Sequence, residues 1–174
     1  MSFLEQLAAE WYEFAGYFVR TNPRARKRAK GGWDVELDVL AYDPENRELL
    51  HIEASGDANS WQERKDRFMK RKFILTRSEY ESIVGASVGA IKKIALVGWS
   101  DTTKAELNWA PDIDVVLIPE FLRGVCANLK RRNFAREAVP ESFPLLRAIQ
   151  LALAFNNEGR TVPHILPPRG RARK

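Results

Sequence analysis

Hydrophobic and polar residues alternate along residues 33–55, and this alternation predicts two antiparallel β-strands. Asp43-Pro44-Glu45-Asn46 divides the segment and is typical of a tight turn, because Pro44 fixes φ and the Asp and Asn side chains can bond the local backbone. One face of the first strand is expected to carry Val35, Leu37, Val39 and Ala41, and the other Asp34, Glu36 and Asp38. On the second strand, Leu50, Ile52 and Ala54 are expected opposite His51, Glu53 and Ser55.

The acidic residues therefore gather on one side of the predicted hairpin. Neighbouring carboxylates repel one another unless a cation or a proton neutralises them, and Mg²⁺ favours such oxygen-rich sites. The alternative is a solvated sheet face with scattered acids, because antiparallel strands are often exposed on one side. His51 lies beside Glu53 in this pattern, and we interpret it as a surface residue or as a hydrogen-bond partner of a metal ligand.

Strands and helices alternate in the rest of the chain, which favours an α/β fold with parallel neighbouring strands. After a helix over residues 3–15, a strand begins at Tyr17 and a basic loop covers residues 20–30. Further strands are predicted at residues 91–99 and 113–118. Further helices are predicted at residues 60–72, within 77–90, and at 102–109, 119–132 and 142–155. The last of these could cover the sheet or mediate homodimer formation.

The first helix offers one carboxylate with two interpretations. Ser2 and Glu5 have the spacing of a capping box, in which each side chain bonds the backbone of the other residue. Glu5 could also complete a metal site. Glu10 and Glu13 are expected to face solvent, and Gly16 to end the helix.

The motif Glu36-Leu37-Asp38-Val39 followed by Ile52-Glu53-Ala54-Ser55 resembles the PD-(D/E)xK, or restriction-endonuclease-like, nuclease superfamily. The closest likeness is to its small Holliday-junction-resolvase-like branch, and Glu5, Ala8, Trp11 and Gly16-Tyr17 fit the opening of that family. The resemblance implies a restriction-endonuclease-like mixed β-sheet flanked by helices. It also implies Mg²⁺ or Mn²⁺ held by Asp38 and Glu53, helped by the Ala54 carbonyl and by Glu5 through water, with cleavage of DNA phosphodiester bonds.

One position departs from the family motif. The third catalytic residue of the family is a lysine that orients or activates the attacking water, and here it is Ser55. Either a base from elsewhere replaces this lysine, or the chain binds nucleic acid without cleaving it. Lys65, on the helix after Glu53, is the expected replacement, with Arg64 and Lys70 as neighbouring candidates.

Two basic segments flank the acidic strands in the sequence. Their bases are predicted to contact nucleic-acid phosphates, with solvated surface charge as the alternative. In the first segment these residues are Arg24, Arg26, Lys27, Arg28 and Lys30, and in the second Arg64, Lys70 and Arg71. The formal net charge of +5 permits such binding.

Composition and length predict one globular domain over residues 1–155 and a Pro- and Arg-rich tail over 156–174. No apolar run is long enough to cross a bilayer, and no signal pattern opens the chain. Cys126 is the single cysteine, so an intrachain disulfide is excluded and a cytoplasmic location is expected. A nuclease is the leading hypothesis, ahead of an inactive nucleic-acid-binding module and a protein-interaction scaffold.

Overall fold

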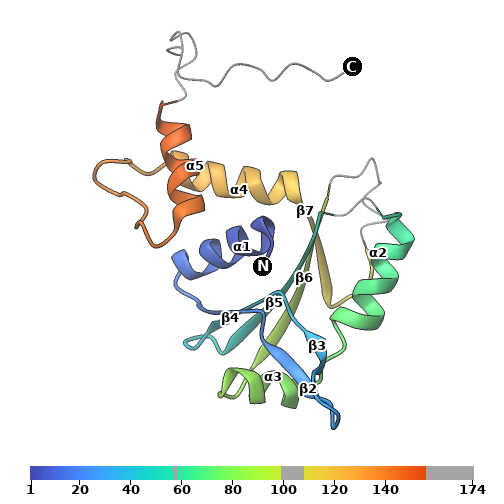
Figure 1. Cartoon of the computed structure of the whole chain (residues 1–174). Helices are drawn as coiled ribbons and strands as arrows, with labels where there is room; N and C mark the ends of the chain where they lie inside the picture. Colours follow the sequence, from blue (N-terminus) through green and yellow to red (C-terminus); the bar gives the residue numbers. More distant parts are fainter. Residues whose placement is uncertain (57–58, 99–107, 156–174) are drawn as a thin grey trace.

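The computed structural model describes residues 1–56, 59–98 and 108–155 (Figure 1). The predicted helix at 102–109 and the tail at 156–174 fall wholly or mostly outside these residues. In chain order the elements are α1 (Phe3–Phe14), β1 (Phe18–Thr21), β2 (Arg24–Lys27), β3 (Trp33–Glu36), β4 (Val39–Asp43), β5 (Glu48–Ser55), α2 (Trp61–Arg67), the π-helix η1 (Phe68–Lys72), α3 (Arg77–Val84), β6 (Ala90–Val97), β7 (Ile113–Leu117), α4 (Ile118–Lys130) and α5 (Pro144–Phe155).

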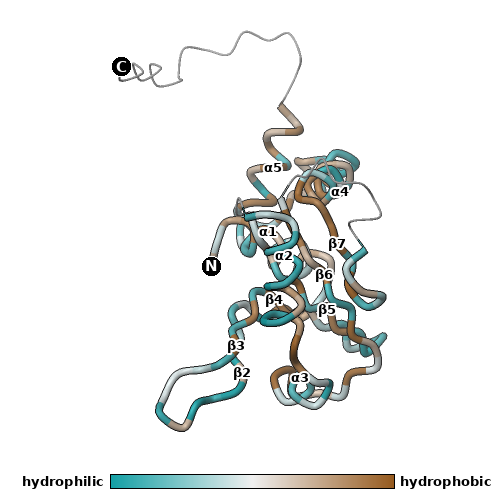
Figure 2. Tube along the Cα trace, turned by 90° about the vertical axis from the view of Figure 1, so that its right-hand side faces the viewer, coloured by the Kyte–Doolittle hydropathy of each residue, from teal (hydrophilic) through white to brown (hydrophobic). Residues whose placement is uncertain are grey.

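The main sheet has the strand order β1-β4-β5-β6-β7. The pairs β1–β4 and β4–β5 are antiparallel, whereas β5–β6 and β6–β7 are parallel. The predicted α/β class with parallel neighbours is therefore confirmed as a mixed sheet. Strands β2 and β3 form a separate two-stranded ribbon that projects from the body of the molecule (Figure 2).

Helices cover both faces of the main sheet. On one face α1 packs on β4 and β5 through a cluster that includes Leu4, Ala8, Val39 and Ile52, and α4 and α5 pack against α1. On the other face Tyr80 of α3 contributes to the cluster around Leu40 and Leu49, and Phe68 of η1 packs over β6 and β7. The solvated sheet face considered from the sequence is therefore wrong, because both sides of β5 are buried.

The predicted first strand of the hairpin is broken in the middle. Leu37 and Asp38 belong to no strand, and their backbone bonds the β1–β2 connection instead, through Leu37 N–H to the Pro23 carbonyl and Asn22 N–H to the Asp38 carbonyl. Val35 and Leu37 consequently join one core cluster, whereas Val39 and Ala41 join the cluster on the opposite face of the sheet. The expectation that all four share one face is wrong.

Local signals for turns and caps are confirmed. The Asp43 carboxylate accepts hydrogen bonds from the backbone N–H groups of Glu45 and Asn46 at 2.9 and 3.3 Å. Ser2 and Glu5 form the capping box of α1, and Gly16 follows that helix with a φ of 99°. No helix within the described residues is long and apolar enough to cross a membrane.

The predicted solvent exposure of Glu10 on α1 is wrong. Glu10 is only 6% exposed, and its Oε2 accepts hydrogen bonds from the backbone N–H groups of Leu145 and Leu146 at 2.9 and 3.0 Å. Because the first N–H groups of a helix lack intrahelical partners, Glu10 serves as the cap of α5. Glu13 is exposed as expected.

Candidate active site

Asp38 and Glu53 meet where the chain passes from β3 into β4. The backbone N–H of Ala54 donates to Asp38 Oδ2 at 2.8 Å, and the backbone N–H of Asp38 donates to Glu53 Oε1 at 3.3 Å. These reciprocal bonds cross from the strand break to β5 and hold the two carboxylates side by side. The break therefore brings Asp38 beside Glu53, with its carboxylate bonded to the backbone of β5.

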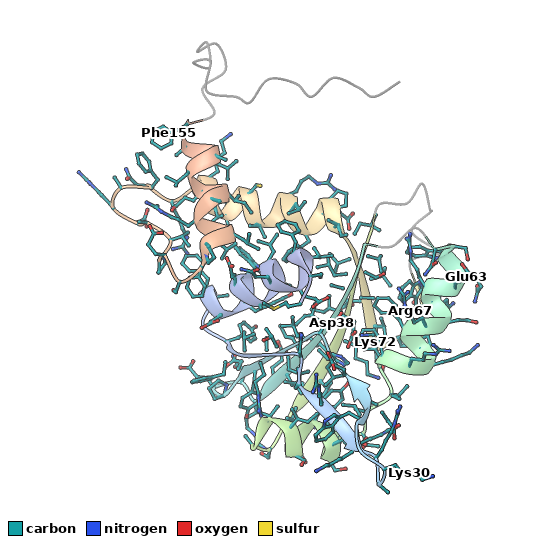
Figure 3. The ribbon with its side chains drawn as sticks, viewed as in Figure 1. Lys30, Asp38, Glu63, Arg67, Lys72 and Phe155 are labelled. Carbon is teal, nitrogen blue, oxygen red and sulfur yellow. The ribbon has the colours of Figure 1, made fainter. Side chains whose placement is uncertain are left out.

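Lys72 is the base that reaches these carboxylates. Its Nζ lies 3.1 Å from Asp38 Oδ1 and 2.6 Å from Glu53 Oε2. The predicted base was Lys65, but within the described part of the chain Lys65 makes no ion pair with either carboxylate. The base that contacts Asp38 and Glu53 is Lys72. Figure 3 shows Lys72 and Asp38 next to each other, with Arg67 beside them on α2.

A π-helical turn sets the position of Lys72. The backbone N–H of Phe73 donates to the Phe68 carbonyl at 2.9 Å, five residues back, where an α-helix would bond four residues back. Lys65 and Lys72 are seven residues apart, so they lie about 10 Å apart along the α2–η1 segment. The base at the carboxylates is therefore Lys72, and the predicted Lys65 lies further towards the start of the helix.

Glu53 is fully buried and is oriented by a buried histidine. His51 Nε2 lies 2.8 Å from Glu53 Oε1, and His51 Nδ1 lies 2.6 Å from the Tyr80 hydroxyl. Burial lowers the pKa of His51 against the opposing effect of Glu53, so the ring is neutral at pH 7. The Tyr80 hydroxyl then donates to Nδ1, and the Nε2 proton is donated to Glu53. Of the two interpretations of His51, the partner of a candidate ligand is the one the structure supports.

The charges of the site depend on one another. Burial raises the pKa of Asp38 to about 6, with a further contribution from the charge of Glu53. Burial also disfavours the charged form of Glu53, but His51 and Lys72 outweigh it and lower its pKa. Burial likewise opposes the charge of Lys72, and the two carboxylates outweigh it and raise its pKa. At neutral pH the site holds two carboxylates against one ammonium group.

Ser55 lies beside this group at the end of β5. Its Oγ accepts a hydrogen bond from Arg67 Nη2 at 2.7 Å, so the serine holds a guanidinium at the same cleft as the two carboxylates. These groups surround a cleft of about 300 Å³. The cleft is lined by Glu5, Asp38, Glu53, Ala54, Ser55, Arg67, Phe68 and Lys72.

Two carboxylates form the ligand set that the site offers to a metal ion. No group of three or more His, Cys, Asp or Glu side chains suited to a metal occurs in the described residues. Glu5 lines the same cleft, but its Oε2 accepts a hydrogen bond from the Ser2 backbone N–H at 3.0 Å, so its capping role is confirmed. A contact of Glu5 through water stays a prediction. One or two carboxylates, with water and substrate oxygens, are the usual ligands of Mg²⁺.

The predicted phosphate-binding residues separate into groups. Arg24 and Arg28 form ion pairs with Glu36 and Asp34 within the ribbon, and Arg26 bonds Glu79 and the Ile74 carbonyl on and beside α3. Arg64 is 8% exposed, so little of its side chain reaches the surface, and its contact with phosphate stays a prediction. The remaining predicted residues Lys27, Lys30, Lys70 and Arg71 are exposed.

A second hollow, of about 390 Å³, adjoins the cleft along α2 and η1. Its lining combines the bases Arg67, Lys70 and Arg71 with the acids Glu63 and Asp66, and Lys70 Nζ lies 2.9 Å from Asp66 Oδ2. Arg67 lines both hollows. The surface that continues from the carboxylates along the helix is therefore mixed in charge, with three bases and two acids.

Comparisons with protein-family models, curated proteins and solved structures find no match to this chain.

Proposed function

We propose that this chain is a divalent-metal-dependent nuclease that cleaves DNA phosphodiester bonds. The observation that carries the proposal is the contact of Asp38 and Glu53 with Lys72 in one cleft, bordered by exposed bases. Asp38 and Glu53 would hold Mg²⁺ or Mn²⁺, with water and substrate oxygens as the remaining ligands. When bound, the cation would polarise the phosphoryl oxygen and lower the pKa of an attacking water.

The side chains around the carboxylates have separate roles in this proposal. Lys72 supplies the positive charge of the missing motif lysine and faces the scissile phosphate once a cation neutralises Asp38 and Glu53. Arg67, held by Ser55, contacts a non-bridging phosphate oxygen, where a guanidinium can donate two hydrogen bonds. His51 fixes the orientation of Glu53 through its Nε2 proton.

The test is metal-dependent cleavage by the full chain on single-stranded, duplex and branched DNA, with Mg²⁺ and with Mn²⁺. We expect Asp38→Ala and Glu53→Ala to reduce cleavage at least 100-fold, because each removes a cation ligand. Glu120→Gln, which changes an exposed carboxylate at the start of α4, is the matched control and should be fully active. Intact DNA under all conditions, or cleavage that persists in both alanine variants, would refute the proposal.

Lys72 distinguishes this mechanism from the one expected from sequence. We expect Lys72→Met to reduce cleavage 10- to 1,000-fold while the affinity for divalent cations rises, since the methionine leaves both carboxylates free for the cation. Lys65→Met is the control and should cleave at close to the wild-type rate. The measurements are single-turnover cleavage and calorimetric cation binding. Equal losses in the two variants would remove the specific role of Lys72.

A specific observation favours one alternative, an inactive nucleic-acid-binding module. The Lys72 ammonium neutralises Asp38 and Glu53 without any metal, so the carboxylate pair can be a stable structural feature. In that case DNA affinity would fall with salt and survive Asp38→Ala, and no cation would bind the chain. A measurement of cation binding therefore distinguishes the nuclease from the inactive binding module, and it needs no known substrate.

A further inference from the structure

The β2–β3 ribbon carries an exposed tryptophan. Trp33 is 41% exposed, whereas the other tryptophans in the described residues, Trp11, Trp61 and Trp109, are buried or partly buried. A tryptophan offers the largest apolar surface of any side chain, and leaving it in water forgoes the stabilisation of burial. Phe3, Phe18 and Phe155 are more exposed still, so exposure alone does not identify a contact site, and the inference for Trp33 depends on its surroundings.

The surroundings of Trp33 are basic. Residues 24–36 contain five bases and two acids, and Trp33 is paired across the ribbon with Lys27. Lys27 and Lys30 are exposed, and Lys30 lies at the end of the ribbon in Figure 3. In the pairs Arg24–Glu36 and Arg28–Asp34 all four side chains are more than 50% exposed. Such pairs are weak, so their arginines can turn to phosphates at little cost.

One arginine anchors the ribbon to the fold. Arg26 donates from Nε and Nη2 to the Glu79 carboxylate at 2.7 and 3.1 Å, and from Nη2 to the Ile74 carbonyl at 3.0 Å. Ala25 and Val35 join the core cluster packed against α3. The base of the ribbon is thus fixed, and its outer part presents Trp33 and the two exposed lysines on a defined support.

Trp33 also lies at a limited distance from the carboxylates. It precedes Asp38 by five residues, which span at most about 18 Å when fully extended. Successive phosphates of one stacked DNA strand are about 3.4 Å apart along the helix axis. A strand that contacts Trp33 and enters the cleft at Asp38 therefore bridges roughly five nucleotide steps or fewer.

We propose that Trp33 stacks on an unpaired base of a DNA strand held by the ribbon. The substrate would then carry a single-stranded stretch within about five nucleotides of the bond at the cleft. A base inside a duplex has both faces covered by its neighbours, so a side chain can stack there only after the base steps separate, whereas an unpaired base offers its face freely. Stacking on an aromatic ring tolerates every base, and the lysines add sequence-independent contacts to phosphate. The position of the bond rests on the proposed nuclease function, but the stacking does not.

Binding without metal tests this inference independently of cleavage. The full chain in EDTA is titrated with a labelled 20-nucleotide single strand and with a duplex of the same length, and 2-aminopurine in the single strand reports stacking. Because one stacked base contributes about 1–3 kcal/mol, Trp33→Ala should weaken single-strand binding by roughly 5- to 150-fold. It should also remove the 2-aminopurine quenching. Duplex binding should change less than twofold, and Trp33→Phe should retain most of the affinity.

Met69 supplies the matched control. It is 38% exposed on η1 beside the basic helix, so Met69→Ala removes an exposed apolar side chain of the neighbouring surface. It should leave single-strand affinity unchanged, and thermal melting should show that both variants remain folded. Equal weakening for single strand and duplex, or no effect of Trp33→Ala, would overturn the inference. A Trp33-dependent change in sedimentation of the free protein would assign Trp33 to self-association and overturn it too.

The two proposals fail separately. Trp33-dependent single-strand binding in a protein that never cleaves DNA leaves the stacking inference standing and refutes the nuclease. Cleavage that depends on Asp38, together with single-strand binding that is indifferent to Trp33, leaves the nuclease standing and refutes the stacking inference.

Discussion

Asp38 is the residue whose protonation links the candidate site to pH. Its pKa is raised to about 6, first by burial and then by the charge of Glu53, despite the opposing effects of the Ala54 N–H and Lys72. The protonated form therefore prevails below pH 6. An ionised carboxylate is needed to bind a divalent cation, so cation binding should require a pH above this value.

We expect cation affinity and cleavage to fall roughly tenfold between pH 7 and pH 5, because about a tenth of Asp38 remains ionised one pH unit below its pKa. Calorimetric titrations with Mg²⁺ from pH 5 to pH 8 would measure this. Asp38→Asn is the control, since its residual affinity should lack this transition. An affinity for Mg²⁺ that is constant over that range in the wild type would contradict the expectation.

The ionised form of Asp38 also lowers the free energy of unfolding. The folded pKa of about 6 exceeds the ordinary value of 3.8, so the folded state binds the proton more tightly and stability rises as pH falls from about 6 towards 4. The ionised carboxylate thus destabilises the folded chain at neutral pH. Asp38 keeps a charge that folding alone would not select, as is common for functional residues.

At the scale of elements, the site joins β5 to α3 through a chain of buried polar groups. Tyr80 of α3 contacts His51, and His51 contacts Glu53, both in β5. His51 also packs edge-on against the Phe73 ring, with ring centroids 4.9 Å apart. The histidine has a protein partner on each nitrogen, so removal of either partner leaves a buried polar atom without one.

We expect Tyr80→Phe to lower the free energy of unfolding by about 1–3 kcal/mol, because it leaves His51 Nδ1 buried and unbonded. Chemical denaturation would measure the change. Tyr42→Phe removes the hydroxyl that donates to the Ser87 carbonyl at 3.0 Å and serves as the control, with an expected loss of about 1 kcal/mol or less. A larger loss at Tyr42 than at Tyr80 would show that the buried histidine tolerates the missing donor.

The elements were largely predictable from the sequence, and the exact geometry of the site was not. Hydrophobic periodicity and caps located most elements, and alternation in the second strand placed His51 and Glu53 on the same face. The predicted loop over residues 20–30 is wrong at Arg24–Lys27, which form β2, because successive bases give no hydrophobic alternation. The break at Leu37 and Asp38 has no local signal, because Asp38 continues the polar alternation and the break is set by bonds to the β1–β2 connection. The π-helical turn that presents Lys72 is likewise absent from any spacing rule.

The burial of a charged residue was also not predictable from the sequence. The pattern placed Glu10 on the polar side of α1, and nothing nearby in the sequence indicates a partner more than 130 residues away in α5. A sequence pattern reports the environment along one element. It gives no information on which backbone N–H groups of another element, left without intrahelical partners, will lie against that element in the fold.

At the scale of the whole molecule, Glu10 joins the two ends of the described chain. We expect Glu10→Ala to lower the free energy of unfolding by about 2–3 kcal/mol, because it leaves the first N–H groups of α5 without an acceptor. Glu13→Ala on the exposed side of α1 is the control and should change it by about 0.5 kcal/mol or less. Thermal and chemical denaturation would measure both. Equal effects would show that water replaces the cap.

The Glu10 cap has a consequence for biosynthesis. During translation α1 leaves the ribosome before α5, because the amide groups that bond its buried carboxylate lie more than 130 residues later in the chain. Until then, burial of Glu10 would leave its Oε2 without these two hydrogen bonds, although Gln6 Nε2 donates to its Oε1 at 3.0 Å. The nascent chain should therefore close its helical layer only after release of residues 144–155, and ribosome-bound fragments that stop earlier should be sensitive to protease at α1.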